Sequence, residues 1–205
     1  MNRAAIVLCG GTSTRMGVDK ASLPFGGETM LARVVGRLST VVDAIALVAA
    51  QEQPLPEVPA TAATILIARD ARPGRGPLEG LAAGLRSLPE GYGAAFVTSC
   101  DAPLLSSAFV ERMFLLLDEA HDIVAPTHAG RVHPLAAVYR RGVVATVEQL
   151  LAGDQLKMQG LLAACRTRIV SAETWRDVDP ESHSLLNCNT TSDYEAALRL
   201  AELLD

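Results

Sequence analysis

Short apolar runs alternate with amphipathic stretches along almost the whole chain, and this alternation limits the fold more than any other feature. The run "AAIVLC" (4–9) contains no polar position, as expected of a strand covered on both faces. Residues 28–39 instead repeat apolar side chains at helical spacing. The same reasoning predicts strands at 43–50, 64–68, 93–99, 122–126, 133–140 and 167–171, and helices at 77–88, 105–119, 142–152 and 157–165. A final helix is predicted from Ser192, with Glu195 completing a capping box.

Repeated strand–helix–strand units predict an α/β fold, a single-domain Rossmann-like arrangement with a mostly parallel sheet and helices on both faces. No internal repeat, low-complexity tract or interior linker interrupts the 205 residues, so we expect one domain over residues 1–205. Aromatic residues make up only 4% of the chain, and small aliphatic residues suit helices packed on a parallel sheet. Ligands of such sheets bind beyond the carboxyl ends of the strands, so the loops after the first, third and fourth strands are the expected places for chemistry.

Charge and cysteine content restrict the partners and the compartment. The formal net charge of -5 argues against a nucleic-acid polymer, which usually calls for a basic face. No apolar run reaches the roughly 18 residues of a membrane span, and the apolar part of "MNRAAIVLCGG" is too short for a signal peptide. The four cysteines, Cys9, Cys100, Cys165 and Cys188, show no C-x-x-C spacing. These features predict a cytoplasmic protein with reduced cysteines and no membrane partner.

The loop after the first strand, "CGGTSTRMGVDK", combines glycines with two cations. Gly10 and Gly11 allow a ligand to approach the main chain, whose free N–H groups suit phosphate oxygens. Arg15 can fork onto a phosphate, and Lys20 supplies a point charge. The loop is neither a Walker A loop nor a G-x-G-x-x-G dinucleotide fingerprint. Glycines and cations alone leave a second interpretation open, a surface loop with two solvated cations.

Two further segments follow predicted strands. In "SCDAPLL", Asp101 ends a buried strand beside the phosphate loop, which is where a magnesium ligand would lie, although an aspartate before Pro103 can also simply cap a turn. In "RPGRGPLEG", glycines surround Pro77 at the start of a helix. This segment is either a plain helix entrance or the backbone-lined wall of a pocket for a base or sugar.

Together, "LCGGTSTRMGVDK", "GPLEG", "SCDAPLL" and "LNCNTTSDYE" resemble the molybdopterin nucleotidyltransferases of the NTP-transferase superfamily, over residues 4 to 198. The first motif is specific for the wider superfamily, and the guanylyl-transferring members are the most similar. The resemblance implies transfer of GMP from GTP to the terminal phosphate of molybdenum-molybdopterin, with Mg²⁺ as cofactor and release of pyrophosphate. It implies GTP and the molybdopterin cofactor as partners, and molybdoenzymes or cofactor-delivery proteins as candidates for further ones.

The same resemblance assigns roles to individual positions. It implies nucleotide binding by Leu8, Cys9, Gly10, Gly11, Lys20, Asp70, Gly76, Pro77, Leu78, Gly80 and Asp101. It implies catalytic roles for Arg15, Lys20 and Asp101, with Asp101 as the metal ligand. The acceptor side is assigned to His133, Pro134, Asn187 and Asn189.

Some positions depart from the family pattern. Cys9 and Glu79 stand where the family usually has alanine, and Ala49 or Ala50 stands where it has a nucleotide-contacting asparagine. Guanine rather than cytosine is favoured by Gly11 and by "GPLEG".

Three functions therefore remain open at this point. Besides the guanylyltransferase, the chain could be a cytidylyltransferase or another small-phosphate nucleotidyltransferase of the superfamily, or a nucleotide-binding module without catalysis. Simple binding would not need Arg15, Lys20 and Asp101 together, which argues against the last of these. His121, His128 and His133 are expected to be surface or hydrogen-bonding residues rather than metal ligands, and Trp175 a packing residue.

Overall fold

One mixed β-sheet crosses the molecule in the computed structural model, which describes residues 2–10, 19–70, 72 and 74–202. Its strands lie in the spatial order β10 (Thr167–Ser171), β7 (Ile123–His128), β9 (Ala137–Arg140), β6 (Tyr92–Ser99), β1 (Asn2–Leu8), β4 (Ala44–Ala49) and β5 (Thr64–Arg69). Six of these seven strands run parallel, and β9 runs antiparallel between β6 and β7. A short strand, β8 (Arg131–Val132), pairs with the end of β7.

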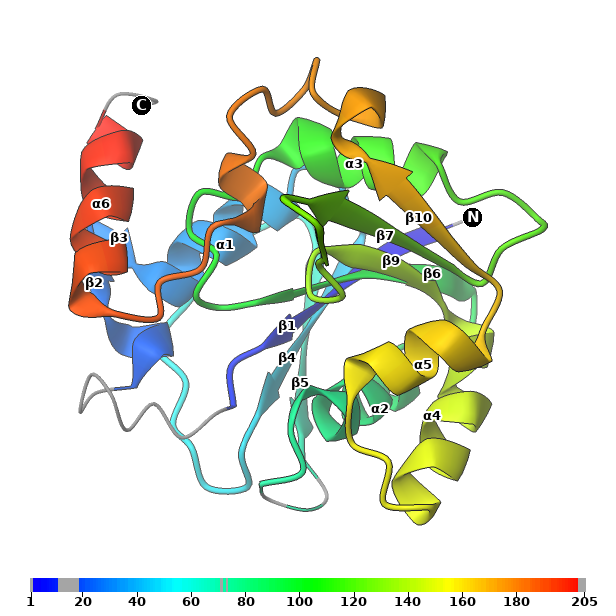
Figure 1. The fold of residues 1–205 in the computed structure, drawn as a ribbon. Helices are drawn as coiled ribbons and strands as arrows, with labels where there is room; N and C mark the ends of the chain where they lie inside the picture. Colours follow the sequence, from blue (N-terminus) through cyan, green and yellow to red (C-terminus); the bar gives the residue numbers. More distant parts are fainter. Residues whose placement is uncertain (1, 11–18, 71, 73, 203–205) are drawn as a thin grey trace.

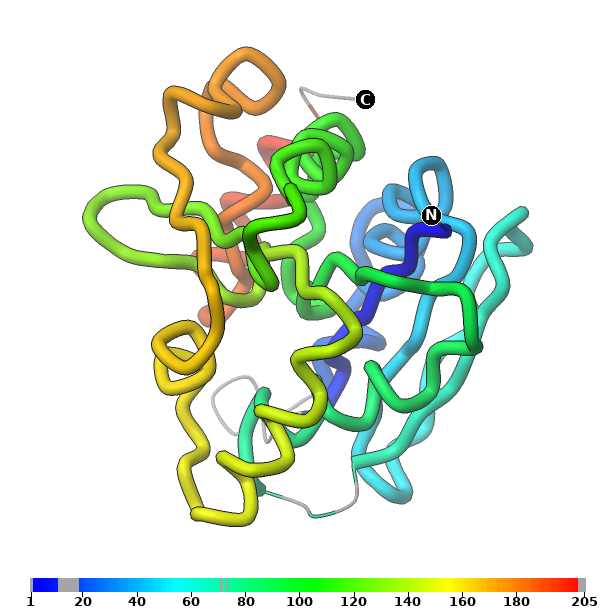
Figure 2. Tube along the Cα trace, turned by 90° about the vertical axis from the view of Figure 1, so that its right-hand side faces the viewer, coloured from blue at the N-terminus to red at the C-terminus, as the bar shows by residue number. Residues whose placement is uncertain are grey.

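Helices cover both faces of this sheet (Figure 1). On one face, α1 (Met30–Leu38) and α3 (Ser107–Leu115) bury their apolar sides in one core cluster. On the other face, α2 (Pro77–Ser87), α4 (Val144–Ala152) and α5 (Met158–Ala164) form a second cluster. The predicted fold class, a mostly parallel α/β sheet with helices on both faces, is confirmed. Figure 2 shows the consequence of the strand order, with the early strands and the late strands on opposite sides of the molecule.

One glycine allows α2 to pack closely on the central strand β1. A Cβ atom at Gly84 of α2 would lie 2.5 Å from Cγ2 of Ile6, so the two elements can approach this closely only with glycine there. Ile6 itself is fully buried in the core cluster that α2 covers. This close contact lets α2 pack tightly on the face of the sheet that β1, β4 and β5 form.

A small third cluster joins the two ends of the chain. The hairpin of β2 (Pro24–Phe25) and β3 (Glu28–Thr29) packs against α6 (Thr191–Glu202), and the rings of Phe25 and Tyr194 meet edge to face at 6.3 Å. The Tyr194 hydroxyl donates to the carbonyl of Pro24. The remaining short helical turns are η1 (Lys20–Ser22), η2 (Arg141–Val143), η3 (Ala172–Thr174) and η4 (His183–Leu185).

Two local predictions were wrong. The predicted strand 133–140 forms only from Ala137, because the residues before it make a turn in which the Ala136 amide donates to the His133 carbonyl at 3.1 Å. The capping box of α6 uses Thr190 and Asp193, not Ser192 and Glu195. The Asp193 amide donates to the Thr190 hydroxyl at 3.1 Å, and the Thr190 amide donates to the Asp193 carboxylate at 2.9 Å. The Thr-x-x-Asp spacing forms the same kind of reciprocal cap two residues earlier.

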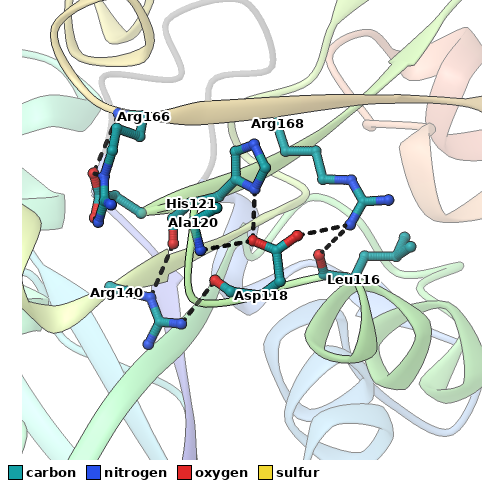
Figure 3. A network of polar contacts seen from close by, with 8 residues as sticks. Leu116, Asp118, Ala120, His121, Arg140, Arg166 and Arg168 are labelled. Carbon is teal, nitrogen blue, oxygen red and sulfur yellow. Dashed lines mark hydrogen bonds and ion pairs between the residues drawn. The ribbon is translucent and has the colours of Figure 1, made fainter.

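A network of polar contacts lies at the amino ends of β7 and β10 (Figure 3). Asp118 accepts from His121 at 2.7 Å and from Arg168 at 3.3 Å, and Arg168 also donates to the Leu116 carbonyl at the end of α3. The hydrogen bond from His121 is the main reason that the pKa of Asp118 lies below its ordinary value. Since the network ties α3 to the edge strands far from the carboxyl ends, its role is structural, and the expected hydrogen-bonding role of His121 is confirmed. Trp175, fully buried against Phe109, is confirmed as a packing residue.

Candidate functional site

The residues predicted after separate strands come together at the carboxyl edge of the sheet, which is the end where its parallel strands finish. The parallel strands β1, β4, β5 and β6 all end there, and Gly10, Asp70 and Asp101 lie one or two residues beyond the ends of β1, β5 and β6. Backbone hydrogen bonds hold these ends in register, from the Gly10 amide to the Val48 carbonyl at 3.3 Å and from the Asp70 amide to the Ala49 carbonyl at 3.0 Å. Strand topology therefore builds the site, as expected for an open α/β sheet.

Asp101 presents a fixed carboxylate at this edge. It is 8% exposed and lies in the turn after β6. The Ser99 hydroxyl donates to its Oδ1 atom, and its backbone carbonyl accepts from the Cys188 amide at 2.8 Å. One carboxylate oxygen is thus held by the strand end, and the other, Oδ2, is directed at the residues around Lys20.

Lys20, the first residue of η1, contacts Asp101 directly. Its ammonium lies 2.7 Å from Oδ2 of Asp101 and 2.9 Å from Oδ1 of Asn189. The side chains of Lys20 and Asp101 are only 17% and 12% exposed, so this ion pair is largely shielded from solvent. Lys20, Asp101 and Asn189, predicted from three distant segments, form one cluster.

Two residues that the sequence-based predictions missed hold the backbone around Lys20 in place. Asp19 caps η1, accepting from the Ala21 amide at 3.2 Å and from the Gln53 side chain at 3.0 Å. The Gln53 amide nitrogen also donates to the Cys9 carbonyl at 3.0 Å. An Asp before a short helical turn is a recognisable cap signal. Nothing in the sequence pattern identifies Gln53, because its partners are far from it along the chain.

Asn189 is oriented by the capping box of α6. Its amide donates to the Asp193 carboxylate at 3.1 Å, which fixes the backbone from which its side chain extends toward Lys20. The pKa of Asp193 is lowered chiefly by its hydrogen bonds from Thr190. Asp193 is also the second carboxylate near the Lys20 ammonium. The wrong capping-box prediction therefore missed a residue of the candidate site.

Asp70 lies between the end of β1 and the start of α2. A Cβ atom at Gly10 would lie 3.2 Å from its Oδ2 atom, and one at Gly80 would lie 3.4 Å from its Oδ1 atom, so both glycines make room for this carboxylate. Oδ1 is buried and has no hydrogen-bond partner among the described residues. Burial, and then the charge of Glu79, raise the pKa of Asp70. Such a carboxylate can accept hydrogen bonds from a ligand at this place.

Glu79, which stands where the family usually has alanine in this segment, is buried beside an arginine. It is 5% exposed, and its carboxylate lies 3.5 Å from Nε of Arg75. Arg75 also donates to the Leu151 carbonyl near the end of α4. The Glu79 side chain thus belongs to a buried link between α2 and α4.

The other predicted nucleotide-binding residues differ in what they can offer. Gly76 has φ +73° and precedes Pro77, the first residue of α2, so this turn depends on glycine. Leu78 is fully buried, and Leu8 and Cys9 are nearly so, which leaves their backbone rather than their side chains for any ligand contact. The hydrogen bond with Cys9, together with burial, raises the pKa of the Cys100 thiol well above its ordinary value. Gly11 and Arg15 lie outside the described residues.

A cavity of about 400 Å³ lies at the end of β7, on the same edge of the sheet. It is lined by His128, Ala129, Arg131, His133, Glu181, Ser182, Leu185 and Leu186. Burial, and then the neighbouring His128, lower the pKa of His133. Of the four residues predicted on the acceptor side, His133 lines this cavity. Pro134, Asn187 and Asn189 are not in its lining, although the chain from Leu186 to Asn189 leads from the cavity to Asp101.

A metal ion at this edge would need ligands from its substrate. Within the described ranges, no group of three or more His, Cys, Asp or Glu side chains is arranged to hold a metal. Mg²⁺ commonly binds through one or two protein oxygens together with substrate phosphates, and Asp101 and Asn189 offer two such oxygens. Over the same ranges, no helix is long and apolar enough to cross a membrane.

Removing the charge of Asp70 is expected to stabilise the protein at neutral pH. A pKa raised by folding means that ionised Asp70 costs stability, and this cost is present above the raised pKa and vanishes below the unfolded value. Asp70→Asn should therefore raise Tm at pH 7, by at most about 4 °C because the side chain is only half-buried. Melting curves from pH 4 to 8 check this, and a variant that melts below the parent at pH 7 would contradict it.

Similar proteins share both the sequence and the fold. Residues 5–170 match the MobA-like NTP transferase domain. A probable molybdenum cofactor guanylyltransferase from Mycobacterium avium (strain 104) is 40% identical over 199 residues, covering 96% of this chain and 95% of that protein. Molybdopterin-guanine dinucleotide biosynthesis protein A from Archaeoglobus fulgidus superimposes with a TM-score of 0.80 at 22% identity, covering 98% of this chain and 99% of the other. Rv0371c from Mycobacterium tuberculosis H37Rv, crystallised in complex with manganese, superimposes with a TM-score of 0.65 at 16% identity, covering 97% and 99%.

Proposed function

The chain belongs to the MobA-like NTP transferase family, and we propose that it transfers GMP from GTP to the terminal phosphate of molybdenum-molybdopterin. The observation that carries this proposal is the nearly full-length similarity to a probable molybdenum cofactor guanylyltransferase. The cluster of Lys20, Asp101 and Asn189 at the carboxyl edge supports it, because Lys20 offers a cation for the phosphates and the other two offer oxygens for a metal ion.

In the proposed reaction an oxygen of the acceptor phosphate attacks the α-phosphorus of GTP. A new phosphorus–oxygen bond forms, the bond from the α-phosphorus to the bridging oxygen breaks, and pyrophosphate leaves with the electron pair. The attacking phosphate is already an anion, so the chain needs no general base. Its residues align the two phosphates and offset their charge, with Lys20 stabilising the pyrophosphate as it leaves.

Asp101 and Asn189 would hold Mg²⁺ in this site. Their side-chain oxygens already meet at one cation, the Lys20 ammonium, and a carboxylate with an amide oxygen is a donor set that Mg²⁺ accepts. When bound, the ion would neutralise and orient the triphosphate. The Ser99 hydroxyl and the Cys188 amide keep Asp101 in place for this role.

The order of strands suggests how the two substrates would lie. Nucleotide binding is assigned to the side of β1, β4 and β5, where Asp70 offers a carboxylate oxygen that has no partner among the described residues. The acceptor is assigned to the side of β7, where His128, Arg131 and His133 line the cavity. Asp101, at the end of β6, lies between the two sides. The arginine and two histidines of this lining can donate to an anionic acceptor, and Glu181 is the one carboxylate among its lining residues.

GTP is expected to bind more tightly than CTP, by about tenfold or more, because guanine presents hydrogen-bond donors that the unpaired oxygen of Asp70 can accept. Calorimetric titration of both nucleotides with Mg²⁺ measures this preference. Asp70→Asn is the companion variant, and its preference for GTP should be smaller. Equal or tighter binding of CTP by the parent would contradict guanylyl transfer and favour a cytidylyltransferase.

A further inference from the structure

We propose that Lys20 is a placeholder for the metal ion: without nucleotide, its ammonium occupies the position where Asp101 and Asn189 would hold a divalent cation. The metal would then bind tightly only together with a triphosphate. This inference rests on the proposed function, which assigns both the triphosphate and the metal to this edge of the sheet.

The geometry of the cluster is that of a cation site already filled by the chain. Oδ2 of Asp101 and Oδ1 of Asn189 lie 2.7 and 2.9 Å from one nitrogen, and both are oxygens that a hard cation prefers. Asp101 is fixed by Ser99, and Asn189 by the capping box of α6, so neither has to move to present its oxygen. The two oxygens are therefore arranged for a cation, and Lys20 supplies one.

Charge makes the two occupants mutually exclusive. The carboxylates that face the ammonium are Asp101, in direct contact, and Asp193, behind Asn189. A divalent ion bound to Asp101 would lie within a few ångströms of the ammonium, in a place where little solvent screens their repulsion. Lys20 must therefore leave Asp101 before a metal can use the same oxygen.

Lys20 can leave without unfolding its surroundings. Its backbone is anchored in η1 by the Asp19 cap and through Gln53, while its four-carbon side chain has rotatable bonds. Phosphate oxygens of a bound nucleotide would give the displaced ammonium a new partner. Without them, displacement leaves a charge unpaired, which lowers the metal affinity of the nucleotide-free protein. Nucleotide and metal should therefore each raise the affinity for the other.

Titration of the full chain with Mn²⁺, followed by the electron paramagnetic resonance signal of free Mn²⁺, tests this inference. In the absence of nucleotide, Lys20→Met should bind Mn²⁺ about tenfold or more tightly than the parent, equivalent to about 1.4 kcal/mol. Lys157→Met is the matched control, because it removes the same charge from the chain's other lysine, which is exposed. It should bind Mn²⁺ as the parent does. Equal affinity of Lys20→Met and the parent would overturn the inference.

A double variant locates the gained affinity. Adding Asp101→Asn to Lys20→Met should abolish the gain, and a gain that persists would place the metal elsewhere and overturn the inference. Thermal melts of each variant establish that it is folded. The proposed function fails separately. If Lys20→Met gains Mn²⁺ affinity but the parent protein forms no guanylylated product, guanylyl transfer is contradicted and the placeholder role is supported.

Discussion

Asp101→Asn is expected to lower the rate of guanylyl transfer by about 10²-fold or more, the usual scale for losing one electrostatic element of an active site. Asparagine has nearly the same shape, and its carbonyl oxygen can still accept from the Ser99 hydroxyl, so the turn after β6 should persist. What is lost is the negative charge that pairs with Lys20 and that, in the proposed function, would hold a metal ion.

Steady-state rates at saturating Mg²⁺ measure this effect, with melting curves as the control for folding. Ser106→Ala is a useful comparison, because this residue caps α3 beyond the same turn and should change stability rather than rate. Turnover of Asp101→Asn within a few-fold of the parent would mean that Asp101 only shapes the turn.

Lys20→Ala is expected to reduce kcat by about 10²-fold while changing KM for GTP less. Charge grows on the leaving pyrophosphate in the transition state, so part of the stabilisation by Lys20 exists only there. Lys20→Arg should restore little activity, because a planar guanidinium does not replace a compact ammonium between Asp101 and Asn189.

The Lys20 prediction has a signature that a merely structural role would not give. Loss of the side chain should weaken turnover and at the same time strengthen metal binding in the absence of nucleotide. Lys157→Ala, at an exposed position, should alter neither property. Kinetics of Lys20→Ala that match those of the parent would remove this residue from the phosphate role.

Much of the fold could be predicted because its strands are covered on both faces. A run such as "AAIVLC" has no polar position, and the strand that it forms is buried between β4 and β6. The prediction failed where local signals were weak. The hairpin of β2 and β3 has only two residues in each strand, too few for a periodic pattern. The turn before β9 ends in Leu135 and Ala136, which continue the apolar run of the strand, so the pattern did not separate the turn from the strand.

The candidate site could be predicted only as separate pieces. Asp101 and Lys20 stand out because each follows or precedes a recognisable turn at the end of a strand. Lys20 meets Asp101 across 81 positions and Asn189 across 169, so both contacts depend on how distant segments pack together. No pattern within one segment carries that information. Gln53 was missed for the same reason, since it acts through the backbone of Cys9 and the side chain of Asp19.

The most direct test of the account is to incubate the protein with molybdenum-loaded molybdopterin, Mg²⁺ and each of the four nucleoside triphosphates, and to measure pyrophosphate together with the mass of the product. We expect GTP to give one pyrophosphate for each guanine dinucleotide formed, and little pyrophosphate when the acceptor is left out. Pyrophosphate formation that does not depend on the acceptor, a product that carries cytidine, or no product with any of the four nucleotides would contradict guanylyl transfer by this chain.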